Sequence, residues 1–253
     1  MATKINLLLQ QVPKNSLLLS SWMTKQNMST KEQSLCVKSG WLRRLSQGVY
    51  HRVGDVPTLY SAISSFNKQL GKKCFIGAST ALDLRGFSHF VAMGKPTAYL
   101  FTQTSQRLPF WILNHSWDME VRYFTTKIFG NDFIGIEEME VNGVELLVSS
   151  PERSFMECLH LAPTNYSLLD TYYVMEMLTT LRPKLVQQLL EVCTSVKVKR
   201  LFLFMAEKSK HQWFSSISLS KVDLGEGKRS IVKNGVYNNK YGITLSKELY
   251  DYE

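Results

Sequence analysis

Residues 29–52 have the sequence STKEQSLCVKSGWLRRLSQGVYHR, and this stretch decides the fold of the first part of the chain. It begins with Ser29-Thr30-Lys31-Glu32, a capping box in which the Ser29 hydroxyl accepts from the Glu32 amide and the Glu32 carboxylate accepts from the Ser29 amide. The box predicts a helix to about Ser39, which Gly40 ends. After Gly40 the pattern alternates at every second residue. That alternation predicts two strands, residues 41–45 and 48–52, joined through Ser46-Gln47-Gly48.

Two shorter helices are predicted upstream of the capping box. Residues 4–12 have helical periodicity that stops at Pro13. Residues 17–27 are predicted to form a second helix, with Leu18, Leu19, Trp22 and Met23 on one apolar stripe. Three helices followed by a basic hairpin is the order of a winged helix-turn-helix domain.

The third predicted helix has a small, polar and basic outward face. Its phase places Leu35, Cys36 and Ser39 on one side and Thr30, Lys31, Ser34, Val37 and Lys38 on the other. Side chains of the second kind fit a major groove and contact phosphates and base edges. The predicted DNA-binding residues are Thr30, Lys31, Gln33, Ser34 and Lys38 on the helix, with Arg43, Arg44, Gln47, His51 and Arg52 in the hairpin. A solvated strand edge is the alternative for Arg43 and Arg44, and strand alternation places these two on opposite faces.

The net charge of the chain is concentrated at one end. Residues 1–95 carry 13 Lys and Arg against three acidic residues, a net charge of +10, whereas residues 96–253 have a net charge of −1. A solvated surface usually mixes both signs, so a one-sided basic excess on a helix-turn-helix segment indicates a polyanion-binding module. We therefore predict a winged helix-turn-helix DNA-binding domain over residues 1–95.

Residues 96–253 are predicted to form a mixed α+β domain, with strands first and helices after. Strands are expected at residues 98–103 and 128–136 and around residues 138–149, where Asn142-Gly143 is a hairpin turn signal. Ser149 is expected to cap a helix that begins at Ser150-Pro151-Glu152. Further helices are expected at residues 168–181, 184–193 and 195–207. A last hairpin is expected at Asn234-Gly235. The fold class is α+β, and Gly94-Lys95-Pro96 marks the expected domain boundary.

Enzyme chemistry finds little support in the residue pattern. Residues 225–230 contain Gly225, Gly227 and Lys228 but lack the Walker A spacing, so a basic turn is the better interpretation. Glu137, Glu138 and Glu140 could form a nuclease carboxylate set, although a solvated strand explains them more simply. The four cysteines are expected to be buried, reduced thiols, and no metal site or cofactor is predicted. No apolar run is long enough to span a bilayer or to act as a signal peptide, so a cytoplasmic location is expected.

Several stretches resemble one protein family. Residues 40–50, GWLRRLSQGVY, and residues 77–90, GASTALDLRGFSHF, resemble the N-terminal region of the AbiEi antitoxins of bacterial type IV toxin–antitoxin systems. Ser150-Pro151-Glu152-Arg153, Leu181-Arg182-Pro183 and residues 195–203, 223–229 and 240–244 are similar to the C-terminal domain of that family. The resemblance covers almost the whole chain, in order.

The resemblance implies a non-enzymatic protein with two roles. The first domain would bind inverted repeats in double-stranded DNA at its own promoter and repress the operon, as a monomer in solution or cooperatively on DNA. The second would be needed for antitoxicity against a nucleotidyltransferase-like toxin, without an assumed stable complex. A second basic surface is predicted there, comprising Lys197, Lys199, Arg200, Lys228 and Arg229, with simple solvation as the alternative. Two other functions stay open: a winged-helix regulator with a ligand-sensing second domain, and an enzyme acting on nucleic acid.

Overall fold

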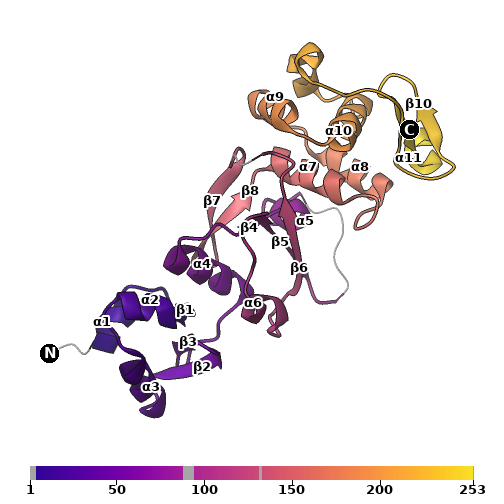
Figure 1. The fold of residues 1–253 in the computed structure, drawn as a ribbon. Coiled ribbons are helices and arrows are strands. Elements are labelled where there is room, and N and C mark those ends of the chain that lie inside the picture. Colours follow the sequence, from indigo (N-terminus) through magenta and orange to yellow (C-terminus); the bar gives the residue numbers. More distant parts are fainter. Residues whose placement is uncertain (1–3, 88–93, 131–132, 253) are drawn as a thin grey trace. The chain divides into compact units, whose positions relative to one another are not determined.

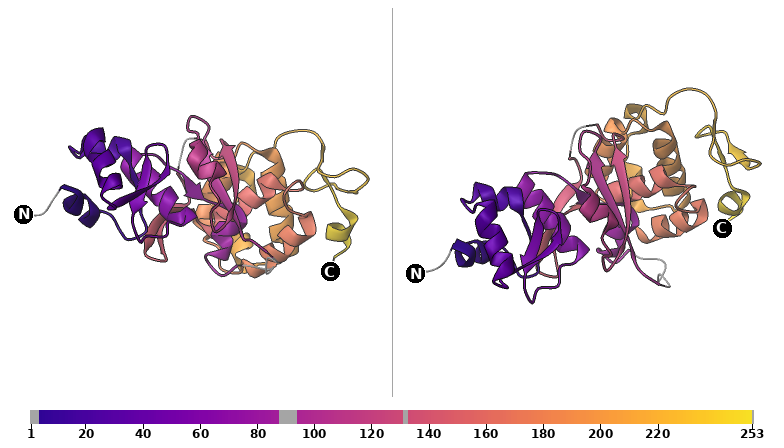
Figure 2. Two further views of the ribbon diagram at one scale, coloured as in Figure 1. Left: turned by 90° about the horizontal axis from the view of Figure 1, so that it is seen from below. Right: turned by 60° about the horizontal axis from the view of Figure 1, so that its bottom comes forward.

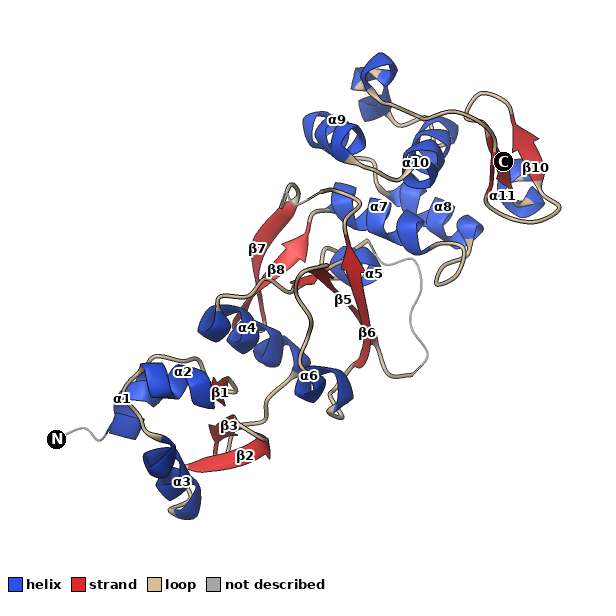
Figure 3. Cartoon of the chain, in the orientation of Figure 1, coloured by secondary structure: helices blue, strands red, loops and turns tan. Residues whose placement is uncertain are grey.

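The computed structural model describes residues 4–87, 94–130 and 133–252 (Figures 1 and 3). The chain divides into two compact units. Unit 1 comprises residues 1–75, 94–123 and 138–147, and unit 2 comprises residues 76–93, 124–137 and 148–253. The fold class is α+β, as the sequence predicts, and begins with a winged helix-turn-helix domain. The expected boundary between residues 95 and 96 stays a prediction. No helix in the described part of the chain is long and apolar enough to cross a membrane.

The first six elements follow the winged-helix order. They are α1 (Lys4–Gln10), β1 (Leu17–Leu19), α2 (Ser20–Lys25), α3 (Thr30–Lys38), β2 (Leu42–Ser46) and β3 (Val49–Arg52). The strands form an antiparallel sheet in the order β1-β3-β2, and β2 and β3 make the wing. The predicted capping box is confirmed, because Ser29 caps α3 and exchanges hydrogen bonds with Glu32. Gly40 follows the helix with a φ of 78°, a conformation that favours glycine.

The helix predicted over residues 17–27 is wrong in its first turn. Leu17, Leu18 and Leu19 form β1, which pairs with β3, and α2 begins only at Ser20. A run of three leucines fits a buried strand as well as a helix, so periodicity alone could not separate the two. Pairing with β3 decided the outcome.

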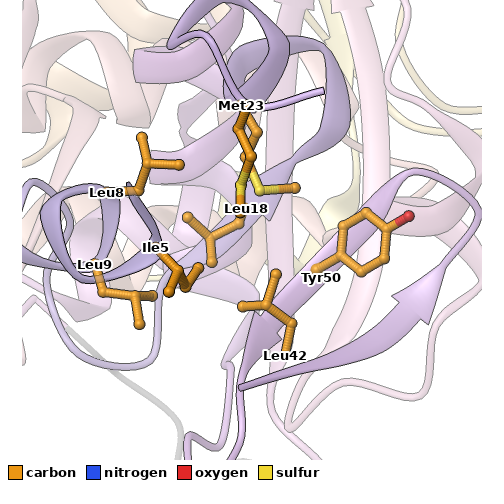
Figure 4. Close-up of a cluster of buried hydrophobic side chains, with 8 residues drawn as sticks. Ile5, Leu8, Leu9, Leu18, Met23, Leu42 and Tyr50 are labelled. Carbon is orange, nitrogen blue, oxygen red and sulfur yellow. The ribbon is translucent and has the colours of Figure 1, made fainter. Parts of the chain in front are cut away.

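The core of this domain is a single apolar cluster (Figure 4). It gathers residues from α1, β1, α2, the segment between α2 and α3, and the wing, namely Ile5, Leu8, Leu9, Leu18, Met23, Met28, Leu42 and Tyr50. Trp22, Cys36 and Val37 pack against it from its edge. The cluster thus joins α3 and the wing to a common apolar interior, which sets their relative position.

Helix α4 (Leu59–Leu70) closes the open edge of the wing sheet. Thr58 caps it, and Leu59 donates its amide to Asp118. Leu17 donates its amide to the Ser65 hydroxyl at 3.0 Å, and Leu19 donates to the Gln69 side-chain oxygen at 2.8 Å. Gln69 in turn donates to the Leu17 carbonyl. Two side chains of α4 therefore satisfy the backbone groups that β1 would otherwise leave unpaired.

A five-stranded sheet follows, in the order β6-β5-β4-β8-β7. Its strands are β4 (Phe75–Ile76), β5 (Thr97–Gln103), β6 (Glu120–Thr126), β7 (Ile136–Val141) and β8 (Val144–Ser149). Asn142 and Gly143 form the predicted turn between β7 and β8. The strand expected at residues 128–136 is wrong, because residues 128–130 form a turn and β7 begins at Ile136; residues 131 and 132 lie outside the described part. Helix α5 (Ala78–Asp83) follows β4, and α6 (Phe110–Asn114) lies between β5 and β6.

Unit 2 carries a group of helices, the orange segments of Figure 2. They are α7 (Pro151–Leu161), α8 (Leu168–Met177), α9 (Pro183–Val192) and α10 (Val196–Lys208), and α7 contacts each of the other three. The expected cap at Ser149 is wrong: Ser149 ends β8, and the Ser150 hydroxyl accepts from the Arg153 amide. Glu152 instead accepts from the amide and the guanidinium of Arg182.

The C-terminal segment contains two short 3-10 turns, β9 (Arg229–Ser230), β10 (Val236–Asn238), β11 (Ile243–Leu245) and α11 (Lys247–Asp251). The hairpin expected at Asn234-Gly235 is wrong. Strand β10 pairs with β11, and β9 joins β11 in parallel. The four cysteines are free thiols; Cys74, Cys158 and Cys193 are buried as expected, whereas Cys36 is half-buried.

Candidate nucleic-acid interface

The N-terminus of α3 is anchored to α1. The Ser29 hydroxyl accepts from the Glu32 amide at 3.3 Å, and the Glu32 carboxylate accepts from the Ser29 amide at 2.7 Å and from the Lys4 ammonium at 2.8 Å. These hydrogen bonds, with that of Lys4 the strongest, lower the pKa of Glu32 to about 2. Ionised Glu32 therefore holds the start of α3 at neutral pH, where it also complements the helix dipole.

Gln33 faces the interior and not the predicted interface. Its side chain is 1% exposed. Its amide nitrogen donates to the Met28 carbonyl at 2.9 Å and to the Thr24 hydroxyl at 3.2 Å, and its oxygen accepts from the Ser20 hydroxyl at 2.6 Å. Gln33 is thus a wrong assignment, since these bonds use it to lock α3 against α2. Amphipathic patterns count glutamine as polar and exposed, so they miss a buried amide of this kind.

The outward face of α3 carries Thr30, Lys31, Ser34, Leu35 and Lys38, all exposed. Leu35 is 54% exposed, whereas Val37 is half-buried against the apolar cluster. The sequence assigned these two to the opposite sides. Gln33, Cys36 and Val37 together form the inward arc, which turns the helix so that Leu35 points outward. The interface therefore contains one apolar side chain that the sequence prediction missed.

Of the four basic residues that were predicted to contact DNA from the wing, two are exposed, one is buried and one is half-buried. Arg43 and Arg44 on β2 are exposed, and the Arg44 guanidinium lies 5.6 Å from the centre of the Tyr50 ring. Gln47 is exposed in the turn. His51 is buried, and Arg52 donates to the Leu9 carbonyl at 2.8 Å. Burial of His51 contradicts its predicted place in the interface, whereas Arg52 is half-buried and its DNA contact stays a prediction. Strand β3 lies between β1 and β2, so its side chains serve the core more than the surface.

We call the resulting set the α3–wing surface: Thr30, Lys31, Ser34, Leu35, Lys38, Arg43, Arg44 and Gln47. It carries four cations and no acidic residue. Helix α3 and the wing present these groups. Both elements are held in place by the common apolar cluster, and α3 also by Gln33. A rigid helix with small polar, basic and apolar side chains suits a DNA groove, and an adjoining basic hairpin suits the phosphate backbone.

The basic surface predicted for the second domain breaks up in the structure. Arg200 is 4% exposed and donates to four carbonyls, those of Leu224, Gly225, Gly227 and Gly242, at 2.7–2.9 Å. Lys199 is buried, and Lys197 donates to the carbonyls of His160 and Ala162, where partial burial lowers its pKa. Lys197 and Arg200 thus bind backbone carbonyls and Lys199 is buried, so the prediction that these three residues form an exposed basic surface is wrong. Lys228 and Arg229 are exposed, and the Lys228 ammonium lies 4.9 Å from the centre of the Tyr237 ring.

Glu137 and the 224–227 loop, which the sequence offered for enzyme chemistry, have structural partners, whereas Glu138 and Glu140 are exposed on β7. Glu137 accepts from Arg85 at 2.7 Å and from Arg182 at 2.8 Å, which ties three segments of unit 2 together. The loop at residues 224–227 directs its carbonyls at Arg200, the opposite polarity to a phosphate cradle built from amides. Among the residues that the structure describes, no group of three or more His, Cys, Asp or Glu side chains could hold a metal ion.

The fold and the α3–wing surface place the protein in the class of winged helix-turn-helix transcriptional regulators. Comparison with known proteins agrees. A family model described as the N-terminal domain of the AbiEi antitoxin transcriptional regulator matches residues 1–93, and one described as the AbiEi antitoxin transcriptional regulator of a type IV toxin–antitoxin system matches residues 95–246. The chain belongs to the AbiEi antitoxin family of type IV toxin–antitoxin systems, as its motifs indicated. This family is described as a regulator and antitoxin, which is not an enzyme class.

A solved structure supports the fold. The crystal structure of the RV2827C protein from Mycobacterium tuberculosis matches with a TM-score of 0.59 and 8% sequence identity, over 97% of this chain and 90% of that one. At this identity the likeness concerns the fold alone. No curated protein matches the chain.

Proposed function

We propose that the protein represses its own operon by binding inverted repeats in the promoter through the α3–wing surface. The single observation that carries this proposal is the set of four exposed cations on α3 and β2, where the one acidic residue, Glu32, is paired with Lys4. In the proposed complex α3 enters the major groove, where Thr30 and Ser34 hydrogen-bond to base edges and Leu35 packs on a thymine methyl group. Lys31 and Lys38 contact phosphates, and the wing contacts the adjacent backbone through Arg43 and Arg44.

Binding to operator DNA explains the concentration of charge at one end of the chain. Each phosphate that Lys or Arg neutralises releases counterions, so the affinity should fall steeply with salt. Inverted repeats offer two half-sites, which the chain would occupy as a monomer on each or cooperatively as a pair. Function on promoter DNA implies the cytoplasm of a bacterial cell.

A gel-shift assay with the intergenic DNA upstream of the chain's own gene tests the proposal. The full-length protein should bind, and the Lys38→Ala/Arg44→Ala variant should have a log–log salt slope shallower by about 1.8, since each phosphate contact contributes about 0.9. The Lys184→Ala/Lys247→Ala variant has the same net charge and changes exposed residues elsewhere. It should behave as wild type. Equal losses in the two variants, or a flat salt response of the wild type, would contradict the assignment.

We further propose that the antitoxin activity counteracts a nucleotidyltransferase-like toxin encoded by the adjacent gene, without requiring a stable complex. The resemblance of residues 150–153, 181–183, 195–203, 223–229 and 240–244 to the antitoxin domain supports this role. Of the five basic residues predicted for antitoxicity, Lys228 and Arg229 are exposed. The carbonyl bonds of Arg200 hold the loop that precedes them.

A further inference from the structure

We infer that a second basic element beside the wing, formed by the 71–73 and 104–107 loops, extends the DNA contact along the phosphate backbone. This inference rests on the proposed operator binding and concerns residues outside the α3–wing surface. We call the element the flanking loops. Their exposed cations are Lys72, Lys73 and Arg107. Neither segment 65–73 nor segment 103–114 contains an acidic residue.

The two loops are joined to each other. Lys73 donates its amide to the Gln106 side-chain oxygen at 3.1 Å. The Gln106 carbonyl accepts from the hydroxyls of Thr102 and Tyr123, which holds the second loop against β5 and β6. Arg107 therefore lies next in the chain to a residue that is bound to the first loop. The Lys68 ammonium on α4 donates to the Glu145 carboxylate at 2.9 Å.

The flanking loops lie at the same end of β1 as the wing turn. Ser20, which follows β1, donates its amide to the Gly48 carbonyl of the wing turn at 2.8 Å. Leu19, the last residue of β1, donates to Gln69 on α4 at 2.8 Å. Lys72 follows Gln69 by three residues. The wing turn and the first flanking loop thus both attach to the junction of β1 and α2, and all the residues involved belong to unit 1.

The attachment is rigid enough to carry a DNA contact. Ser65 and Gln69 replace a neighbouring strand along β1, so α4 cannot shift without leaving the amides of Leu17 and Leu19 unpaired. When a wing lies on the phosphate backbone beside the major groove, the loops next to the wing come close to the neighbouring phosphates of the DNA strand. Exposed Lys and Arg on well-held loops suit such sequence-independent contacts.

A salt titration with the operator duplex tests the inference. In the Lys72→Ala/Arg107→Ala variant the log–log salt slope should be shallower by about 1.8 than in wild type. Hydroxyl-radical footprinting should show lost protection at the outer sugars on the wing side and unchanged protection at the centre. The matched control is Lys14→Ala/Lys95→Ala, which removes the same charge from exposed residues of unit 1 outside the flanking loops. Both variants change exposed side chains, and thermal melting should match wild type.

The possible failures are distinguishable. Retained DNA binding with an unchanged slope and footprint in the Lys72→Ala/Arg107→Ala variant would overturn the flanking contact and leave the operator proposal intact. Absence of binding by the wild type would overturn both. Phe110, three residues after Arg107, is 76% exposed and would suit a protein partner. The Lys72→Ala/Arg107→Ala or Phe110→Ala variant could instead leave the DNA footprint unchanged and fail to protect cells from the toxin. That result would assign the surface to a protein partner instead of DNA.

Discussion

At the scale of single residues, backbone carbonyls decide which cations are available to a partner. Arg43 and Arg44 lie on an edge strand and remain exposed, whereas Arg52 on the central strand donates to the Leu9 carbonyl. Arg200 shows the extreme case, with four carbonyl acceptors. Residue type and sequence spacing do not separate the exposed arginines, Arg43 and Arg44, from Arg200. Only the hydrogen-bond partners distinguish an exposed arginine, which is available to DNA, from one that holds loops together.

We expect Arg200→Met to destabilise the protein by about 3–5 kcal/mol, because four buried or partly buried carbonyls lose a charged donor. Urea unfolding of the full chain measures this, with Lys228→Met as the control. Lys228 is exposed, so the control should change stability by less than about 0.5 kcal/mol. A similar small change in both variants would show that the Arg200 bonds contribute little.

Glu32 predicts a specific pH dependence. Hydrogen bonds from Lys4 and Ser29 lower its pKa from the ordinary value of 4.5 to about 2. A lowered pKa in the folded state means that the stabilisation is fully present above about pH 4.5 and is lost as the pH falls towards 2. Glu32→Gln should therefore lose less stability than wild type between these pH values. Thermal melting across that range provides the measurement, and parallel curves for the two proteins would contradict it.

At the scale of elements, the wing sheet depends on α4, a helix that follows the six elements of the winged-helix order. Leu17–Leu19 becomes a strand because β3 pairs with one of its edges and α4 satisfies the other. The orientation of α3 has a comparable origin, since the buried amide of Gln33 turns Leu35 outward. The elements of the α3–wing surface are therefore positioned by polar side chains from neighbouring elements as well as by apolar packing.

Replacing Gln69 with methionine should destabilise the protein by about 1–3 kcal/mol, because the Leu19 amide and the Leu17 carbonyl lose their partner in the interior. Methionine has a similar volume, so packing changes little. Lys68→Ala on the same helix removes only an exposed ion pair and should cost less than about 1 kcal/mol. Chemical denaturation of both variants compares them. Equal effects would mean that the edge of β1 is satisfied without Gln69.

At the scale of the whole molecule, the chain joins a basic winged helix to a second region of nearly neutral charge. Membership of the AbiEi family assigns regulation and antitoxicity to one polypeptide. The exposed residues proposed for DNA binding lie on the α3–wing surface, whereas those proposed for antitoxicity are Lys228 and Arg229. Mutations should therefore separate the two activities.

We expect Lys228→Glu/Arg229→Glu to abolish protection in cells that co-express the toxin, because a positive surface becomes negative. The same variant should still repress a promoter reporter. Lys38→Ala/Arg44→Ala should do the reverse, and it serves as the matched control. Cell growth and reporter output measure the two activities. Loss of both activities in both variants would argue against separate surfaces.

The linear pattern was sufficient for the parts of the fold that local chemistry dictates. The capping box at Ser29, the glycine after α3 and the alternation in the wing arise from neighbouring residues, so they could be predicted, as could the family from its motifs. Phase errors at Leu35 and Val37 and the strand at Leu17–Leu19 arose because short apolar runs fit more than one structure. For the site, the pattern identified which residues are basic but not which of them are exposed.

Tertiary structure sets which polar and charged side chains are exposed, because this depends on groups far apart in the chain. Gln33 is buried and bonded to residues of the preceding turn and helix, and half-buried Arg52 donates to a carbonyl 43 residues away. Arg200 is taken from the predicted antitoxicity surface by carbonyls 24–42 residues further on. A charged or amide side chain is stable in the interior only when such partners are assembled around it. Composition and spacing predicted a DNA-binding regulator, and long-range hydrogen bonds decided which of its cations can face a partner.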